Sequence, residues 1–166
     1  MTYEEWLRSV PSEITADPLW QMRVYRLALF ACDIGWHDVS ILAQDPRTRS
    51  LADQLYRALG SISANIAEGY SRRSGKERAR FYEYALGSAR EARTWYYQGR
   101  HGLKEAVVAH RLHLLTQIVR LLLSIIPAER EMTGILQLRE ESVPYLYSSP
   151  DPDAELSALL SEVPMP

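Results

Sequence analysis

Basic side chains are concentrated in one stretch of this sequence, and the chemistry that they offer is the binding of anions. Residues 72–104 contain nine lysines or arginines against three acids, whereas the whole chain of 166 residues has a formal net charge of -2. Guanidinium and ammonium groups neutralise backbone phosphates, and this supplies much of the affinity of nucleic-acid binding. The predicted nucleic-acid-binding residues are Arg72, Arg73, Lys76, Arg80 and Arg90.

The same cations can instead pair with acids of the protein itself, and the sequence leaves both alternatives open. Glu68 lies where a helix is expected to end, and an anion is unfavourable at that end of the helix dipole. It therefore needs a cation such as Arg72, Arg73 or Arg78. Glu77 is a second acid for such pairing, so a nucleic-acid interface competes with a purely structural role for these arginines.

Residues that catalyse reactions or hold metals are sparse in the sequence. His110 and His113 are one helical turn apart, a spacing that suits a metal, but no carboxylate shares that spacing. Arg111 lies between them, so a solvated helix face is the favoured interpretation. The single cysteine, Cys32, has no histidine near it in sequence, and no phosphate-binding glycine loop occurs. We expect no enzymatic activity, no cofactor and no metal.

The elements that must position the basic residues are helices, because the spacing of the apolar residues is helical throughout the chain. The connections between them are short, which is typical of an antiparallel up-down bundle. The predicted fold is therefore all-α, a four-helix bundle at residues 17–127 preceded by an N-terminal segment at 1–16. The helices are expected at residues 18–42, 51–69, 75–98 and 103–126.

Capping residues support these boundaries. Asp17 is the expected N-cap of the first helix, and Ser50 that of the second. Ser74 with Glu77 forms a possible capping box for the third helix. Gly69 suits a helix C-terminus, and Pro127 is expected to end the fourth helix. Asn65, with Glu68, Gly69, Ser74 and Glu77, completes the predicted structural motif, and its side chain is expected to bond backbone at the turn.

The last part of the chain differs in composition from the rest. Residues 128–166 hold two arginines against eight acids, and residues 140–166 contain five prolines. This composition predicts a flexible, acidic, largely irregular tail with at most one short helix near residues 153–162. Its charge is opposite to that of residues 72–104, so it is either a competitor for the basic surface or a solubilising tail. Residues 134–166 are expected to be dispensable for folding.

Neither a targeting segment nor a membrane span is expected. The longest apolar run, at residues 112–126, is shorter than the ~20 residues that cross a bilayer. The N-terminal sequence MTYEEWLRSV lacks the basic start and apolar stretch of a signal peptide. The sequence thus predicts a cytoplasmic protein that does not enter a membrane.

Residues 50–96 carry a specific resemblance to a known family. SISANIAEG at 61–69, RRSGKE at 72–77, RF at 80–81 and ALGSARE at 85–91 resemble the four-helix-bundle family of 23S rRNA intervening-sequence proteins. The accessory variability proteins of diversity-generating retroelements are related to that family. The chain departs from the family pattern at three positions: Ser63 stands for proline, Ser71 for glycine and Arg78 for an aromatic residue.

The resemblance implies a homopentamer without known catalytic activity. Its rRNA-associated members have an obscure role, and the retroelement relatives bind a reverse transcriptase and nucleic acid through a basic surface. The partners implied for this chain are therefore itself, RNA or DNA, and a reverse transcriptase. A structural oligomer or a protein adaptor without nucleic-acid binding is the alternative.

An independent reason to expect an oligomer lies on the helix at 103–126. One apolar stripe is enough to close a bundle, yet a second lies about 100° around the same helix. A single chain would leave such a surface in water unless the N-terminal segment or the tail covered it. The predicted oligomer interface consists of Val108, Leu112, Leu115 and Val119.

Overall fold

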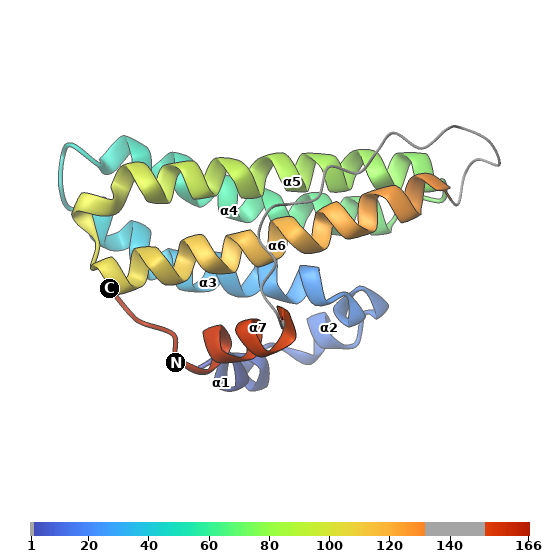
Figure 1. Cartoon of the computed structure of the whole chain (residues 1–166), viewed down its shortest axis with the longest axis horizontal. Helices are drawn as coiled ribbons and strands as arrows, with labels where there is room; N and C mark the ends of the chain where they lie inside the picture. Colours follow the sequence, from blue (N-terminus) through green and yellow to red (C-terminus); the bar gives the residue numbers. More distant parts are fainter. Residues whose placement is uncertain (1, 132–151) are drawn as a thin grey trace.

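Four long helices form the body of the protein and run alternately up and down (Figure 1). The computed structural model describes residues 2–131 and 152–166, in which every regular element is helical. Each long helix packs against the next along the chain, and the last returns to the first, so the four enclose one core. The elements are α1 (Tyr3–Ser9), α2 (Ser12–Thr15), η1 (Pro18–Gln21), α3 (Arg23–Leu42), α4 (Arg49–Tyr70), α5 (Gly75–Gln98), η2 (Gly99–Gly102), α6 (Glu105–Glu131) and α7 (Pro152–Ser161).

The all-α, up-down bundle is thus confirmed, but two helix starts differ from the sequence prediction. Asp17 caps the short 3-10 helix η1, where its carboxylate accepts from the amide of Leu19 at 2.8 Å. Extended backbone at Met22 then separates η1 from α3. Helix α4 begins at Arg49, one residue before the predicted cap Ser50, and has no side-chain cap of its own. The backbone conformation of the connecting residues, and not a side-chain cap, therefore sets the first residue of α3 and of α4.

The third predicted helix begins as expected, and the fourth runs past its predicted end. The Ser74 hydroxyl accepts from the amide of Glu77 at 3.1 Å, which confirms the cap of α5. Pro127 lies inside α6, which continues to Glu131. A proline so near a helix end removes only one backbone hydrogen bond, and the residues after it are held by ion pairs with α5. These pairs are Arg78 with Glu129 and Glu83 with Arg130.

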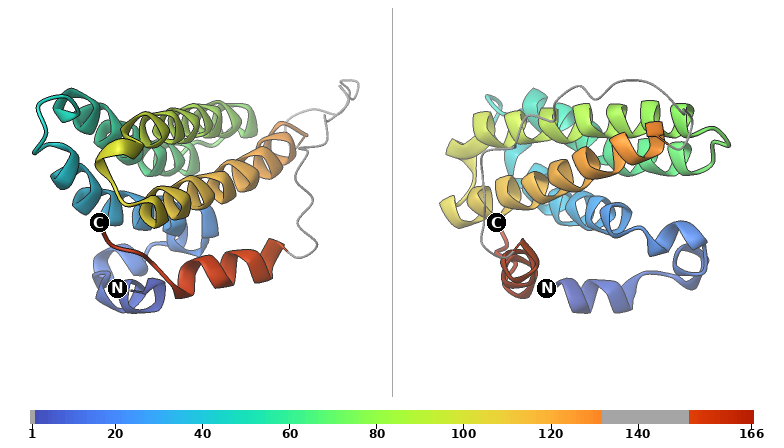
Figure 2. Two further views of the ribbon diagram at one scale, coloured as in Figure 1. Left: turned by 60° about the vertical axis from the view of Figure 1, so that its left-hand side comes forward. Right: turned by 45° about the vertical axis from the view of Figure 1, so that its right-hand side comes forward.

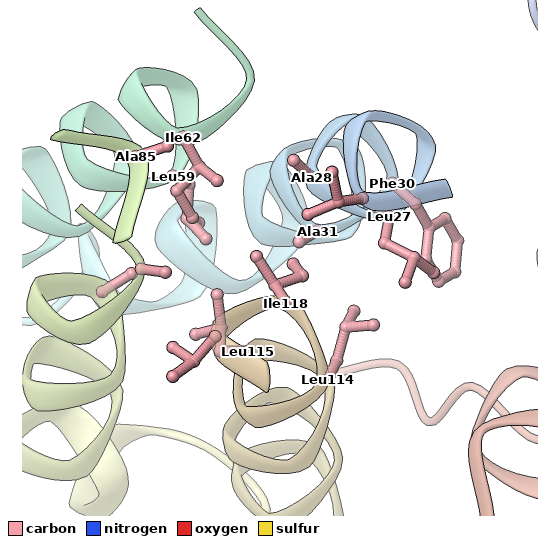
Figure 3. Packing of buried hydrophobic residues seen from close by; sticks show 14 of the residues in the cluster. Leu27, Ala28, Phe30, Ala31, Leu59, Ile62, Ala85, Leu114, Leu115 and Ile118 are labelled. Atoms are coloured by element: carbon pink, nitrogen blue, oxygen red, sulfur yellow. The ribbon is translucent and has the colours of Figure 1, made fainter. Parts of the chain in front are cut away.

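The core lies where the four helices face one another (Figure 3). Leu27 and Ala28 of α3, Leu59 and Ile62 of α4 and Ile118 of α6 are at most 1% exposed. Helix α5 contributes mainly small residues, and its Ala85, Ala89 and Ala92 are wholly buried. Small side chains allow helix axes to approach closely, so α5 can lie tightly against both α4 and α6.

The predicted oligomer interface is largely part of this core. Leu115 and Val119 are at most 1% exposed, Val108 is 7% exposed and Leu112 is half-buried. They are covered within one chain because α6 packs against α5, α3 and α7 at once. The expectation that this stripe is exposed in a single chain was therefore wrong, and the alternative of cover by a terminal segment applies in part.

The two ends of the chain form an extra layer against α3 and α6 (Figures 1 and 2). Helix α1 contacts α7, and Trp6 of α1 and Leu156 of α7 are each 3% exposed. The short helix expected near 153–162 is present, but it packs onto the folded body instead of belonging to a free tail. Residues 132–151 of the predicted tail lie outside the described residues.

By length and composition alone, α6 is able to span a membrane, and no other described helix is. Core helices of soluble proteins share this property, so it is weak evidence of a membrane span. In this structure α6 packs against α3, α5 and α7. The absence of membrane association stays a prediction.

Candidate nucleic-acid interface

The connection between α4 and α5, residues 71–74, carries the first of the predicted binding residues, and Arg72 serves the fold there. Its guanidinium pairs with Glu68 one helical turn earlier and lies over the ring of Phe81, 4.7 Å from the ring centre. The pairing predicted for Glu68 is confirmed, because the cation compensates an anion at the C-terminal end of α4. Arg72 is therefore engaged within the protein.

Arg78 links this connection to the end of α6. Its Nε donates to Glu129 at 2.7 Å, and both side chains are 19% exposed. Its Nη1 donates to the backbone carbonyls of Arg72 and Arg73 at 3.2 and 2.9 Å. Arg78 thus joins the α4–α5 connection to the end of α6.

The other predicted cations face solvent. Arg73, Lys76 and Arg90 are exposed, and none of them pairs with an acid in the part of the chain that the structure describes. The Nε of Arg80 donates to the Tyr84 hydroxyl at 2.7 Å, and its guanidinium also lies over that ring. Helical spacing places the α5 cations on one face of the helix. We name Arg73, Lys76, Arg80 and Arg90 the basic row.

Among the acids near the basic row, one pairs with a cation of another helix and two form no ion pair among the described residues. Glu83 pairs with Arg130 of α6, and Glu91 accepts from the indole nitrogen of Trp95 at 3.1 Å. Glu77 is exposed and forms no ion pair among the described residues, so its predicted pairing is absent there. Positive charge on this face is consequently only partly compensated by the protein.

Two glycines near the basic row differ in how closely they are packed. Gly69 is buried inside α4, and a Cβ there would lie 2.7 Å from Cε1 of Tyr82, so it is a packing contact and not a cap. Gly87 is exposed on α5, and a Cβ there would meet nothing within 4 Å, so it makes no close packing contact. Asn65 donates to the Ser61 carbonyl at 2.8 Å, one turn back in α4, and not to backbone at the turn.

A buried ionic cluster in the core was missed by the sequence prediction. Arg111 of α6 donates through Nε to Asp38 of α3 at 2.8 Å, and their side chains are 1% and 0% exposed. The Tyr96 hydroxyl of α5 donates to the same carboxylate oxygen at 2.7 Å. Burial, then the charge of Asp38, raises the pKa of Tyr96 well above its usual value. One cluster thus joins three of the four long helices.

His110 extends this cluster toward the C-terminal residues. Its Nδ1 lies 2.9 Å from Nη1 of Arg111, and its Nε2 lies 2.9 Å from the Leu159 carbonyl oxygen. A guanidinium only donates, so Nδ1 accepts and the proton of the neutral ring is on Nε2. Burial, then the charge of Arg111, lowers the pKa of His110 to about 4.

His113 also contacts the C-terminal residues, with its Nε2 2.6 Å from Glu155. The solvated face expected for His110 and His113 was therefore wrong, because α7 covers them. Among the described residues, no group of three or more His, Cys, Asp or Glu side chains is placed to hold a metal. Cys32 is half-buried, and burial raises the pKa of its thiol.

Comparison with known proteins places this arrangement in a family. The family model described as 23S rRNA-intervening sequence protein matches residues 22–124, from the start of α3 into α6. The chain belongs to the 23S rRNA-intervening sequence protein family. The basic row and the Asp38–Arg111 pair both lie within residues 22–124, the part of the chain that the family model matches. A comparison with curated proteins finds no match.

A solved structure supports the fold of this 23S rRNA-intervening sequence protein. It is a protein of unknown function from the S23 ribosomal protein family of Bacteroides thetaiotaomicron, with 23% identity and a TM-score of 0.58. The match covers 97% of that chain but 62% of this one. The similarity concerns the fold alone, and it leaves a substantial part of this chain without a counterpart.

Proposed function

We propose that the protein is a non-enzymatic accessory that binds nucleic acid through the basic row. The observation that carries the proposal is the set of solvent-facing cations on and beside α5, Arg73, Lys76 and Arg90, without acidic partners among the described residues. Arg73 also lies beside the N-terminus of α5, where the helix dipole favours anions. RNA is the favoured ligand because the family is named for an rRNA intervening sequence.

Tyr84 gives the basic row a second means of contact. Tyr84 is 45% exposed, and its hydroxyl accepts a hydrogen bond from Nε of Arg80 at 2.7 Å. Exposed aromatic rings among cations stack on unpaired bases, whereas the cations bind phosphates. Single-stranded RNA is therefore expected to bind better than a duplex. A role beside a reverse transcriptase would use the same surface.

The experiment that tests this function compares two triple variants with equal loss of charge. R73Q/K76Q/R90Q removes the free cations of the basic row, and R8Q/R49Q/K104Q removes exposed cations elsewhere. Affinity for a fluorescein-labelled single-stranded RNA is measured by anisotropy over a series of salt concentrations. The first variant is expected to lower the slope of log affinity against log salt by about 2, since each phosphate contact on a single strand contributes about 0.7.

The matched variant sets the outcome that would reject the proposal. R8Q/R49Q/K104Q should keep the wild-type slope, and both variants should keep the wild-type circular dichroism spectrum. Equal salt slopes and affinities for the two variants would show that binding depends on overall charge and not on the basic row. A duplex RNA and a DNA strand of the same sequence then report which nucleic acid is preferred.

A second proposal is that the protein is a homo-oligomer, with a pentamer favoured by the resemblance. The supporting observation is an exposed aromatic pair at α3 and α4, where Trp36 is 57% and Tyr56 is 37% exposed. Their rings meet edge to face, with centres 5.6 Å apart. Light scattering of the wild type and of W36E/Y56E tests it. A mass near 19 kDa for the wild type rejects oligomerisation.

A further inference from the structure

Residues 152–166 contact the bundle in the way that a bound peptide contacts its receptor (Figure 2). We name them the C-terminal arm, which comprises α7 and the extended residues 162–166. Leu156 is 3% exposed, and Leu159, Leu160 and Val163 are partly buried against the core. Leucines at positions i, i+3 and i+4 form the single apolar stripe of an amphipathic helix. The arm therefore presents one line of apolar side chains to the bundle.

The charged contacts of the arm are complementary. Asp153 pairs with Arg23 of α3 at 2.8 Å. The two oxygens of Glu155 lie 3.3 Å from Nη1 of Arg120 and 2.6 Å from Nε2 of His113, both on α6. Acids thus lie on the arm and basic groups on the bundle, and such complementarity selects one class of partner and fixes its register.

The bundle also binds the backbone of the arm. His110 donates to the carbonyl of Leu159, and Nη2 of Arg111 donates to that of Pro164, each at 2.9 Å. Backbone contacts do not depend on the side chain at the contacted position, so other sequences of similar shape can make them. An apolar anchor with main-chain acceptors is a recurring mode of helix and peptide recognition.

The arm lies outside the part of the chain that defines the family. The family match ends at residue 124, whereas its receptor residues Arg23, His110, Arg111, His113 and Arg120 all lie within residues 22–124. The match to the solved relative covers 97% of that chain and 62% of this one. The relative therefore forms the same fold without a counterpart for the rest of this chain. The polar groups that bind the arm therefore belong to the matched bundle, whereas the arm itself, and α1, which also contacts α7, lie outside the match.

From this geometry we propose that the face of α3 and α6 beneath α7 is a docking site for an acidic amphipathic helix. The C-terminal arm is its resident ligand, and a helix of the same chemistry on a partner protein displaces it. Such a partner helix carries acids in its first turn, leucines at i, i+3 and i+4, and an extended segment after it. This inference is independent of nucleic-acid binding by the basic row.

The test uses the full chain with a protease site inserted within residues 132–151, so that the protein folds before the arm is cut. A fluorescent peptide of residues 152–166 is then added to the cleaved protein, and anisotropy follows its exchange with the resident arm. The peptide is expected to bind saturably, and unlabelled peptide should displace it. L156E in the peptide should weaken binding more than about 100-fold, because it would bury an unpartnered charge.

Matched variants separate the charged contacts from the apolar one. E155Q in the peptide, and R120Q in the protein, should each weaken binding about fivefold, since these ion pairs are only partly buried. R73Q/K76Q/R90Q should bind the peptide as the wild type does, which keeps this test distinct from that of nucleic-acid binding.

Three results would overturn the proposal. Loss of the helical circular dichroism signal when the cleaved arm is diluted away would make the arm an integral part of the core. Failure of the peptide to exchange, or equal binding of the L156E peptide, would remove the docking site. A gain in RNA affinity after cleavage without peptide binding would assign the covered face to nucleic acid instead.

Discussion

Arg111 and the basic row show opposite uses of the same chemistry. Arg111 is 1% exposed, and its donors are taken by Asp38, His110 and Pro164. Arg73 and Lys76 are exposed and have no acidic partner in the described part of the chain. A cation surrounded by acceptors maintains the arrangement of helices, whereas one left to solvent can still bind a ligand. The solvent-facing cations of α5 are therefore the candidates for nucleic-acid binding, whereas Arg111 serves the core and the contact with the C-terminal arm.

The sharpest way to test this contrast is to remove Arg111. R111M leaves the Asp38 carboxylate buried without its cation, which is expected to lower the free energy of unfolding by about 3–5 kcal/mol. Urea denaturation followed by circular dichroism measures it. The double variant D38N/R111M also removes the buried charge and should recover part of the loss. Equal stability of R111M and the wild type would mean that the cluster does not hold the helices in place.

The next largest effect is a dependence of folding stability on pH, which comes from His110 beside the buried Asp38–Arg111 pair. Its pKa in the folded protein is lowered to about 4, whereas an unfolded chain protonates histidine near 6.5. Between these values the unfolded state binds more protons, so stability falls as the pH drops from about 6.5 to about 4, by about 2 kcal/mol. Arg111, Asp38, His113 and the carbonyl of Leu159 are the groups that face the ring.

Comparison with H110Q isolates this histidine from the carboxylates that titrate in the same range. The difference in unfolding free energy between wild type and H110Q, measured by urea denaturation, should shrink or reverse on acidification from pH 7 to pH 4.5. A difference that stays constant with pH would show that His110 does not contribute.

Gly69 allows a smaller test of the corner that adjoins the basic row. G69A would place a Cβ 2.7 Å from the ring of Tyr82, and overpacking of this kind costs about 1–3 kcal/mol. A fall in the melting temperature is the expected result. An unchanged melting temperature would mean that the contact between α4 and α5 accommodates the added methyl group without loss of stability.

Gly87 gives the smallest effect and the opposite sign. G87A meets no atom within 4 Å, so it should raise stability by about 0.5–1 kcal/mol through helix propensity alone. Its affinity for RNA should fall if a ligand approaches the backbone of α5 between Arg80 and Arg90. Thermal unfolding and anisotropy measured on the same sample separate the two effects. A destabilised G87A would contradict the open surroundings of this residue.

Helical periodicity was enough to predict the bundle, because each long helix buries one stripe that repeats along its length. The cap at Ser74 followed from local chemistry, since its acceptor and donor are three residues apart. The Asp38–Arg111 pair did not follow, because its members are 73 residues apart in sequence. One signal was present: Asp38 lies one helical turn from each of two core residues, Ile34 and Leu42, on the buried face of α3.

The candidate site was predicted in part. Exposure of Arg73, Lys76, Arg80 and Arg90 agrees with their assignment to a binding surface. Arg72 was assigned to the same surface, but it pairs with Glu68, the alternative that the sequence left open, and its guanidinium lies over the ring of Phe81. The stripe with Val108 and Leu115 was assigned to an oligomer interface, because helical periodicity shows that a stripe is buried but not whether helices of the same chain bury it.

The layer formed by α1 and α7 brings the two ends of the described chain to one side of the molecule, across α3 and α6 from α5 (Figures 1 and 2). A tether at either end therefore anchors the protein by the same side. Attached to a surface, the molecule would present α5 and the basic row outward. Immobilisation through a tag joined after residue 166 would, however, pull on the segment that covers Arg111. A tag joined before Tyr3 therefore disturbs the ionic cluster less.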